Sequence, residues 1–387
     1  MLKLQIVENL ADIAAVQWDA LRQGCAGNNP FLAHAFLLAL QESGCASPAT
    51  GWRAQFITLW RADRLVAALP LYVKTHSWGE FVFDWAWAEA YQQHGLDYYP
   101  KLVSAVPFTP VTGARLLADA AAGDAAEMRA QLIAAALHLA QAAGVSSLHC
   151  LFPRETQAQE MQQHGMLLRR GVQLHWRNPG YADFADYLAS MRRDKRKKIQ
   201  QERRKVNDAG IHFQQVRGEQ ITPEQWAFFM RCYRRTHEQF NAPLALNLDF
   251  FMRIGAAMPQ HILLIVALNA NDEPIASAIN FYDADALYGR SWGTLAFHPG
   301  LHFETCYYQA IEFCIANNLA TFEGGAQGEH KLARGFLPVT TWSAHWLAHP
   351  RFASAVEDFL HRETGGIERY IDELNESSPF KRQQADA

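Results

Sequence analysis

An order of secondary-structure elements that occurs twice constrains the fold of this chain more than any other feature of its sequence. Each half has the hydropathy pattern of a β-hairpin, followed by an extended stretch, a turn containing Gly or Pro, a helix and a strand. The first copy comprises residues 55–60, 65–73, 101–108, 109–113, 127–143 and 145–152. The second copy comprises residues 261–268, 275–282, 287–294, 299–300, 303–314 and 319–323. Such a repeat predicts two related α/β units in tandem.

The two halves are separated by a cluster of residues that break helices and strands, Asn178-Pro179-Gly180. We therefore expect an N-terminal domain over residues 1–176 and a C-terminal domain over residues 177–387. The expected fold class is α/β (α+β), with a mixed central sheet flanked by helices in each domain. In both halves the pattern also predicts a strand and two helices before the hairpin.

Charge is distributed unevenly along the chain, whose formal net charge is −4. Residues 192–205 carry nine basic and two acidic side chains, so this segment contributes +7 and the rest of the chain −11. Apolar residues near heptad spacing predict a basic helix over residues 184–206. Its broad basic face would neutralise phosphates. The basic patch comprises Arg192, Arg193, Arg196, Lys197 and Lys198. The alternative is a solvated helix that joins the two domains.

The sequence predicts no targeting segment and no membrane span. Residues 1–16 contain Glu8 and Asp12 and no uninterrupted apolar core, and the longest apolar runs are only as long as strands. The six cysteines are scattered without a Cys-x-x-Cys pair, as in proteins of a reducing compartment. We therefore expect a cytoplasmic protein. We expect no metal site.

The turn before the second-half helix is a candidate ligand site. A helix N-terminus offers free N–H groups and the positive end of a dipole, and both suit a phosphate-bearing ligand. Within residues 294–304, Gly300 and His302 are expected to contact such a ligand. The stretch matches neither a P-loop nor a Gly-x-Gly-x-x-Gly motif, and an ordinary loop entering a helix is the alternative.

The order of elements resembles the GNAT superfamily of N-acyltransferases. Two such units in tandem resemble its FemAB-type branch, including relatives described as peptidoglycan biosynthesis or recognition proteins. Residues 29–44, 107–113 and 322–336 carry the closer similarity. The resemblance implies transfer of an acyl or aminoacyl group from acyl-CoA or aminoacyl-tRNA to an amine, with no tightly bound cofactor. Neither 109–115 nor 298–304 fits the Gln/Arg-x-x-Gly-x-Gly/Ala loop of GNAT enzymes that use acyl-CoA, and a tRNA donor would give the basic segment a role.

The third of these segments, residues 322–336, is the best catalytic candidate. It begins at the end of a predicted strand, where α/β folds usually place ligands. We expect Glu323 to accept a proton from an acceptor ammonium, and His330, which stands where related transferases tend to have a tyrosine, to act as an acid. Lys331 completes the catalytic set. The donor-binding residues expected around it are Arg290, Gly300, His302, Gly325 and Arg334. The alternative is a local ion pair between Glu323 and Lys331 or Arg334.

The first half carries an aromatic insertion, with eight aromatic and four acidic side chains in residues 76–100. Aromatic faces and carboxylates suit a cationic amine or a sugar. The residues expected to bind the acceptor are therefore Asp84, Trp85, Trp87 and Tyr91. The alternative is that this stretch packs as core or as a dimer contact.

We therefore expect an N-acyltransferase or aminoacyltransferase that works by direct attack on a bound ester or thioester. Its acceptor would be a small-molecule or peptide amine, and tRNA would be a partner if it is the donor. The second hypothesis is a noncatalytic protein that binds tRNA or a cell-wall precursor on a duplicated GNAT fold. The sequence leaves open the donor, the acceptor, the oligomeric state and the half that holds the active site.

Overall fold

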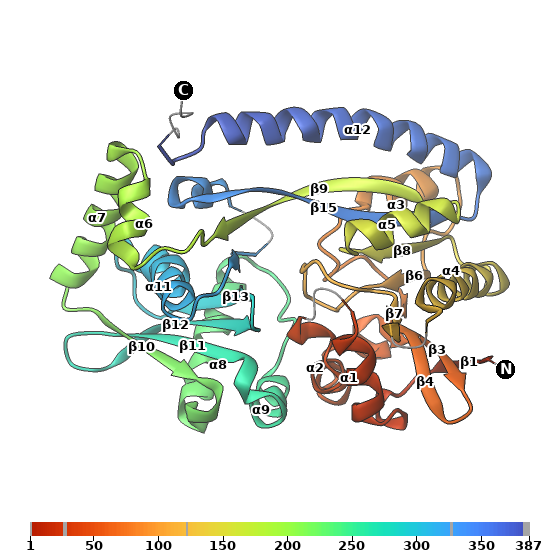
Figure 1. Cartoon of the computed structure of the whole chain (residues 1–387), viewed down its shortest axis with the longest axis horizontal. Helices are drawn as coiled ribbons and strands as arrows, with labels where there is room; N and C mark the ends of the chain where they lie inside the picture. Colours follow the sequence, from red (N-terminus) through yellow and green to blue (C-terminus); the bar gives the residue numbers. More distant parts are fainter. Residues whose placement is uncertain (1, 26–28, 121–122, 326–327, 382–387) are drawn as a thin grey trace. The chain divides into compact units, whose positions relative to one another are not determined.

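Contacts within the chain define two units. The structure is a computed structural model that describes residues 2–25, 29–120, 123–325 and 328–381. Unit 1 comprises Met1–Val172 and Thr340–Arg369, and unit 2 comprises Gln173–Val339 and Tyr370–Ala387. Three elements run from one unit into the other (Figure 1): β9 (Leu167–Arg177), β15 (Phe336–Leu347) and α12 (Pro350–Glu376).

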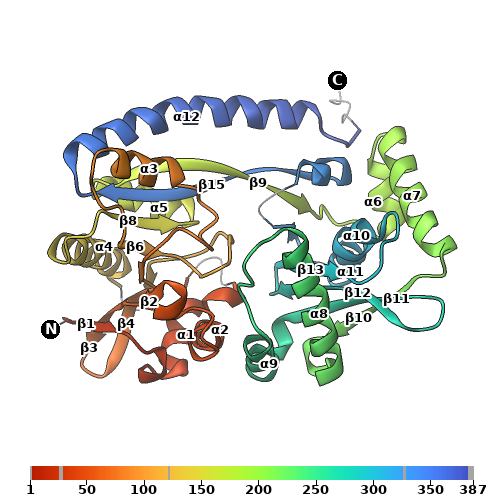
Figure 2. The ribbon, with the colours of Figure 1, turned by 180° about the vertical axis from the view of Figure 1, so that it is seen from behind.

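The strands of unit 1 belong to two sheets. Its elements are β1 (Leu2–Val7), η1 (Leu10–Asp12), α1 (Ala15–Gln23), η2 (Pro30–Leu32), α2 (His34–Glu42), η3 (Pro48–Thr50), β2 (Trp52–Ala54), β3 (Phe56–Arg61), β4 (Arg64–Leu69), β5 (Tyr72–Lys74), α3 (Trp85–Gln93), β6 (Lys101–Ser104), β7 (Leu117–Ala118), α4 (Ala125–Ala142), β8 (Ser147–Leu151) and α5 (Glu155–Gln163). One sheet is antiparallel in the order β1-β3-β4-β7. In the other, β15, β8, β6, β5 and β2 follow one another, and β6 is parallel to β8. Helix α4 lies in the chain between these two parallel strands (Figure 2). It packs on β3, β4 and β7, and its Met128, Leu132 and Ala136 belong to the buried apolar cluster there.

The strands of unit 2 follow one another in the order β10-β11-β12-β13-β14-β9. Its elements are α6 (Phe184–Ser190), α7 (Arg193–Asp208), β10 (His212–Arg217), η5 (Gly218–Gln220), α8 (Pro223–Gln239), α9 (Leu248–Ala257), η6 (Pro259–His261), β11 (Ile262–Leu268), β12 (Pro274–Tyr282), β13 (Ala286–Thr294), α10 (Leu301–Phe303), the π-helical turn η7 (Glu304–Tyr308), α11 (Gln309–Ala316), β14 (Thr321–Glu323) and η8 (Glu329–Arg334). Helix α8 packs on β12 and β13, whereas α11 contacts β13 and β14 from the other face (Figure 1). Because helices cover both faces, every residue of β11 is buried.

The repeat predicted from the sequence is present in both units, with one difference. In each unit a helix joins two parallel strands: α4 joins β6 to β8, and the α10 to α11 segment joins β13 to β14. In unit 2 the hairpin of β11 and β12 adjoins β13 directly. In unit 1 the predicted strand 65–73 is divided into β4 and β5, and the hairpin of β3 and β4 lies in the separate sheet, where β4 also pairs with β7.

The basic segment does not form the single helix over 184–206 that the pattern predicts, so that prediction is wrong. It forms α6 and α7, separated by Met191, which is extended at φ −84° and ψ 156° and bridges Phe380. The backbone N–H of Arg192 donates to the carbonyl of Pro379 at 2.9 Å. The backbone of Met191 and Arg192 therefore pairs with residues 379 and 380, and these backbone groups do not form the hydrogen bonds of a continuous helix.

The sequence did not predict that a segment near the C-terminal end packs in unit 1. Residues 340–369, which the sequence places in the second domain, belong by their contacts to unit 1, because β15 pairs with β8 with Ser343 opposite Leu151. Residue 176, the expected domain limit, lies inside β9. The division into domains 1–176 and 177–387 stays a prediction. Of the described helices, none is both long enough and apolar enough to cross a membrane.

Candidate functional site

Strands β13 and β14 of unit 2 pair over a short stretch and then separate. Their parallel register joins Ala286–Tyr288 to Thr321–Glu323, whereas β13 stays paired with β12 as far as Thr294. Glu323 is therefore the last paired residue of β14, and Gly324 and Gly325 follow it. This is the carboxyl end of a parallel strand, where α/β sheets usually bind ligands.

Arg290 lies at an irregularity of β13. Ile279 of β12 faces Ser291 and Asn280 faces Gly289, so the register shifts at Arg290. A β-bulge of this kind re-aims a side chain. Burial lowers the pKa of the Arg290 guanidinium to about 10, and the charge of Glu323 acts in the opposite direction. The structure thus brings together two residues that the sequence assigned to catalysis and to donor binding.

The Glu323 carboxyl is buried and incompletely hydrogen-bonded. Its side chain is 13% exposed, and its Oε2 atom has no hydrogen-bond partner among the described residues. The Nε2 atom of His175 lies 3.9 Å from that oxygen. Burial raises the pKa of Glu323 to about 8, although the charge of Arg290 lowers it. This carboxyl therefore exchanges its proton near neutral pH, as acids and bases at active sites often do.

Lys331 of η8 lies against the glycine turn that follows Glu323. It is 2% exposed, and its Nζ donates to the carbonyl of Gly325 at 2.8 Å. Burial lowers its pKa to about 8. A Cβ on Gly324 would meet the Phe336 ring at 2.9 Å, so the turn needs a glycine there. Among the described residues Lys331 forms no ion pair with Glu323, so the local ion pair considered from the sequence is not what holds this turn.

Burial favours the neutral form of two histidines near the site. His302 stacks on Trp292 with ring centroids 4.3 Å apart, and burial lowers its pKa to about 4. The Nε2 atom of His330 lies 3.0 Å from the Tyr307 hydroxyl. Burial and the charge of Arg334 lower the pKa of His330. The expected acid role of His330 stays a prediction, and it would involve a neutral imidazole coupled to a hydroxyl.

Arg334 is held by helix α7. Its Nη2 donates to both carboxylate oxygens of Glu202, at 3.0 and 2.8 Å, and its Nη1 donates to the carbonyl of His330 at 2.7 Å. Its guanidinium carbon lies 3.4 Å from the centroid of the Phe303 ring. These contacts attach α7 to the site. Donor binding by Arg334 stays a prediction, and it would require the guanidinium to exchange one of them.

Packing explains the two predicted glycines. Gly300 precedes α10 at φ +90°, and a Cβ there would lie 3.2 Å from the carbonyl oxygen of Glu202 and 3.3 Å from the Val206 side chain. Gly325 has φ +85° and accepts the Lys331 hydrogen bond. Both positions favour glycine for conformational reasons. Their contact with a donor stays a prediction. Ala326 and Gln327 of the predicted segment 322–336 lie outside the described residues.

The predicted basic patch is on the solvent side of α7. Ile199 and Val206 are each 1% exposed and face the interior of unit 2. Arg203 of the same helix pairs with Glu304 and Glu312. The patch residues are exposed apart from a half-buried Arg196: Arg192, Arg193, Arg196, Lys197 and Lys198. Helix α7 is therefore anchored by one face and presents positive charge on the other.

The residues predicted to bind the acceptor are in unit 1, at and after the start of α3. Asp84 is 3% exposed, pairs with Lys101 and accepts a hydrogen bond from the Tyr98 hydroxyl at 2.7 Å. Trp87 and Tyr91 belong to a buried cluster, whereas Trp85 is 42% exposed. Core packing, the alternative considered from the sequence, explains the positions of Trp87 and Tyr91. An acceptor site formed by Asp84, Trp85, Trp87 and Tyr91 stays a prediction.

Sequence reasoning missed a buried polar network in unit 1. The Nζ of the fully buried Lys101 donates to Glu80 at 2.9 Å and pairs with Asp84. Nearby, His149 and His345 are joined between their Nδ1 atoms at 2.7 Å. These residues come from segments far apart in the chain. The only signal was local: a lysine and a histidine stand within strands that are otherwise apolar or small.

Comparison with known proteins shows the fold and the family. The chain resembles FemX at a TM-score of 0.54 with 11% identity, covering 89% of this chain and 98% of that chain. It resembles L-PGS from Bacillus licheniformis at 0.53 with 11% identity, covering 90% and 97%. The C-terminal domain of a putative lysylphosphatidylglycerol synthetase from Agrobacterium fabrum gives 0.54 with 9% identity, covering 89% and 95%. At such identities the likeness shows the fold alone, and the mixed α/β fold expected from the sequence is confirmed. No curated protein matches this sequence.

The family comparison covers nearly the whole chain. The family described as peptidoglycan biosynthesis/recognition matches residues 9–382. The match includes both pairs of parallel strands, β6 with β8 and β13 with β14, and the segment from Glu323 to Arg334. The chain therefore belongs to the FemAB-like family of peptidoglycan biosynthesis/recognition proteins.

Proposed function

We propose that unit 2 transfers an acyl or aminoacyl group from an ester or thioester donor to an amine acceptor. The observation that supports this most directly is the Glu323 carboxyl, which is buried, has a pKa of about 8 and has an oxygen without a hydrogen-bond partner among the described residues. Such a group is suited to taking a proton from an ammonium. Membership of the FemAB-like family supports the same class of reaction and does not favour the noncatalytic alternative.

In the proposed reaction the acceptor nitrogen attacks the carbonyl carbon of the donor directly. The ammonium gives a proton to the ionised Glu323, the neutral amine then forms the C–N bond, and the second proton that the nitrogen loses passes to solvent. As the C–O bond of an ester donor breaks, Glu323 returns the proton to the leaving oxygen. Lys331, held at the glycine turn after Glu323, supplies positive charge for the carbonyl oxygen or for a donor phosphate.

Aminoacyl-tRNA is the donor we favour over acyl-CoA. The exposed cations of α7 suit a polyphosphate backbone, which would bind with a strong dependence on salt. Neither candidate turn has the glycine loop expected of acyl-CoA users. We also propose a cytoplasmic location, no tightly bound cofactor, and a small-molecule or peptide amine as acceptor.

A transfer assay tests the proposal. The full chain is incubated with radiolabelled aminoacyl-tRNA or with labelled acetyl-CoA, and with a peptidoglycan stem peptide that carries a free amine. We expect labelled peptide from aminoacyl-tRNA, and a rate about 10²–10⁴-fold lower for Glu323→Gln. The matched control is Glu219→Gln, which changes an exposed carboxylate of the same unit. Absence of product from both donors, or full activity in Glu323→Gln, would overturn the proposal.

A further inference from the structure

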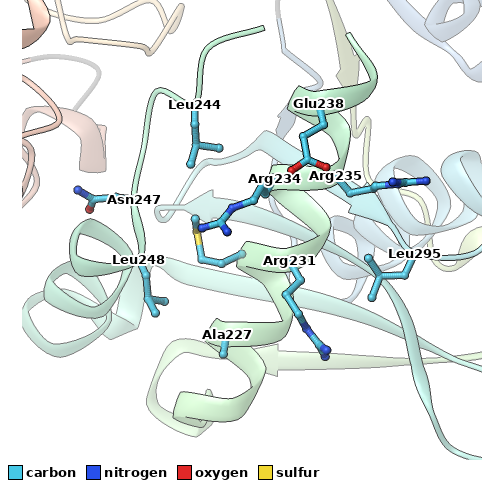
Figure 3. A pocket seen from close by; sticks show the side chains of 10 residues that line it. Ala227, Arg231, Arg234, Arg235, Glu238, Leu244, Asn247, Leu248 and Leu295 are labelled. Carbon is cyan, nitrogen blue, oxygen red and sulfur yellow. The ribbon is translucent and has the colours of Figure 1, made fainter. Parts of the chain in front are cut away.

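A surface of unit 2 combines an apolar cavity with arginines, and the transfer reaction does not account for it. The cavity has a volume of about 360 Å³ and lies between α8, the start of α9 and the residue after β13 (Figure 3). Leu244, Leu248 and Leu295 provide apolar wall, and they come from three different segments. Arg231, Arg234 and Arg235 also line it.

The leucines of this surface are exposed to solvent. Leu244, Leu248 and Leu295 are 40%, 39% and 47% exposed. Met252, one helical turn after Leu248 on α9, is 40% exposed, and Phe297, close in sequence to Leu295, is 89% exposed. Large apolar side chains gathered at the surface mark a binding site more often than ordinary surface.

Arg231 is a neighbour of both Arg234 and Arg235 on the surface of α8, because the spacings are three and four residues. All three are exposed. Glu238 is the acidic side chain among the described residues that line the cavity, so the lining carries a net positive charge. Within the described part of the chain, neither Arg234 nor Arg235 forms an ion pair. Their charge is available to an anionic partner.

The surface rests on a fixed base. The Thr236 hydroxyl of α8 donates to the carbonyl of Trp292 at 3.0 Å, and Gly293 allows the helix to lie directly on β13. On α9, Phe251 stacks on Trp226 at 5.8 Å and holds the helix by its buried face. The exposed leucines and arginines are therefore presented by packed elements.

We propose that this surface docks on a bilayer that contains anionic phospholipid. The apolar side chains enter the interface, and Arg231, Arg234 and Arg235 contact lipid phosphates. Apolar insertion and electrostatic attraction are the two contributions to interfacial binding, and both are present here on one face. A nucleic acid would use the arginines, but aliphatic side chains do not provide the aromatic stacking that favours single strands. The inference does not depend on the transfer reaction, so either can fail without the other.

Vesicle flotation of the full chain tests the proposal. Vesicles are prepared from phosphatidylcholine alone or from equal parts of phosphatidylcholine and phosphatidylglycerol. We expect flotation with the anionic vesicles, weakened about a hundredfold by the triple variant R231Q/R234Q/R235Q. We expect the double variant L244S/L248S, which keeps the charge, to bind at least tenfold more weakly. Circular dichroism and thermal melting establish that each variant is folded.

The matched control removes the same charge elsewhere, in the triple variant K3Q/R53Q/R351Q, which changes three exposed cations of unit 1. We expect this variant to float like the unchanged protein. The proposal is overturned if the unchanged protein does not bind anionic vesicles, or binds neutral ones equally well. It is also overturned if L244S/L248S binds normally, if the unit 1 variant and not the α8 variant loses binding, or if the α8 arginines bind RNA in place of vesicles.

Discussion

Each unit buries a lysine and a carboxyl beside its pair of parallel strands, but the two units treat these charges differently. In unit 1, Lys101 at the start of β6 is paired with both Glu80 and Asp84. In unit 2, Glu323 at the end of β14 and Lys331 of η8 form no ion pair with one another among the described residues, and Lys331 donates to a backbone carbonyl.

The pKa values of Asp84, Lys101, Glu323 and Lys331 follow from this difference, whereas burial raises the pKa of the paired Glu80 to about 7 although the charge of Lys101 lowers it. Burial alone would raise the pKa of Asp84, but the charges of Lys101 and His149 and the hydrogen bonds from Lys101 and Ser77 together lower it to about 2. Burial alone would lower the pKa of Lys101, but its two carboxylates raise it. In unit 2 burial prevails, so the pKa of Glu323 rises and that of Lys331 falls, each to about 8. Paired buried charges support structure, whereas buried groups that titrate near neutral pH suit proton transfer.

The largest effect we expect comes from Lys101→Met. The substitution leaves the buried Asp84 carboxylate without its ammonium partner, which destabilises a protein by about 3–5 kcal/mol. Urea unfolding followed by circular dichroism measures the loss. The control is Lys205→Met, which removes an exposed lysine of α7. If Lys101→Met has the same unfolding free energy as the unchanged protein, the ion pairs of Lys101 do not stabilise unit 1, and the contrast with unit 2 is wrong.

The ion pair of Arg334 and Glu202 tests whether unit 2 also contains a charge pair with a structural role. We expect a coupling free energy of about 1–3 kcal/mol between Arg334→Gln and Glu202→Gln, because the Arg334 side chain is 3% exposed. A double-mutant cycle of unfolding free energies provides it. A coupling indistinguishable from zero would mean that the Arg334–Glu202 pair does not help to attach α7.

The pH dependence of transfer is expected to show a maximum near pH 8. The reaction needs Glu323 ionised, which requires pH above its pKa of about 8, and Lys331 protonated, which requires pH below its pKa of about 8. The rate should therefore fall on both sides, by about tenfold per pH unit far from the maximum. Single-turnover rates between pH 6 and pH 10 measure this. A rate that does not change over this range would contradict the assigned roles.

The smallest effect concerns the exposed cations. Neutralising Arg193, Lys197 and Lys198 should weaken tRNA binding. It should also reduce the slope of the logarithm of the association constant against the logarithm of salt concentration by about two to three. Filter binding at several salt concentrations measures both. The control neutralises three exposed cations of unit 1, in the variant K3Q/R53Q/R351Q. Equal losses in the two variants would show a nonspecific attraction in place of a site on α7.

The repeated elements could be predicted because their hydropathy patterns are local. The strands 261–268 and 275–282 and the helix 127–143 were found within a few residues of their ends. Glu323 could be singled out because two glycines follow it at the end of a strand. The break at Met191 could not be predicted, since it depends on pairing with Phe380.

Features of the site that depend on contacts between distant segments could not be predicted either. The bulge at Arg290 arises from the register of two strands, and register is a property of the pair. The network of Lys101, Glu80 and His345 joins segments that no local pattern connects. The aromatic segment was ambiguous because aromatic residues serve both cores and binding sites.

The most direct test of the account makes the same change in both units, Glu323→Gln and Glu80→Gln, and measures single-turnover transfer together with the unfolding free energy. Both side chains are buried carboxyls, and the change preserves shape. We expect Glu323→Gln to lose at least about 10²-fold in the single-turnover transfer rate and to keep its unfolding free energy. We expect Glu80→Gln to keep its transfer rate and to be less stable. A normal rate in Glu323→Gln, or a loss of rate confined to Glu80→Gln, would contradict it.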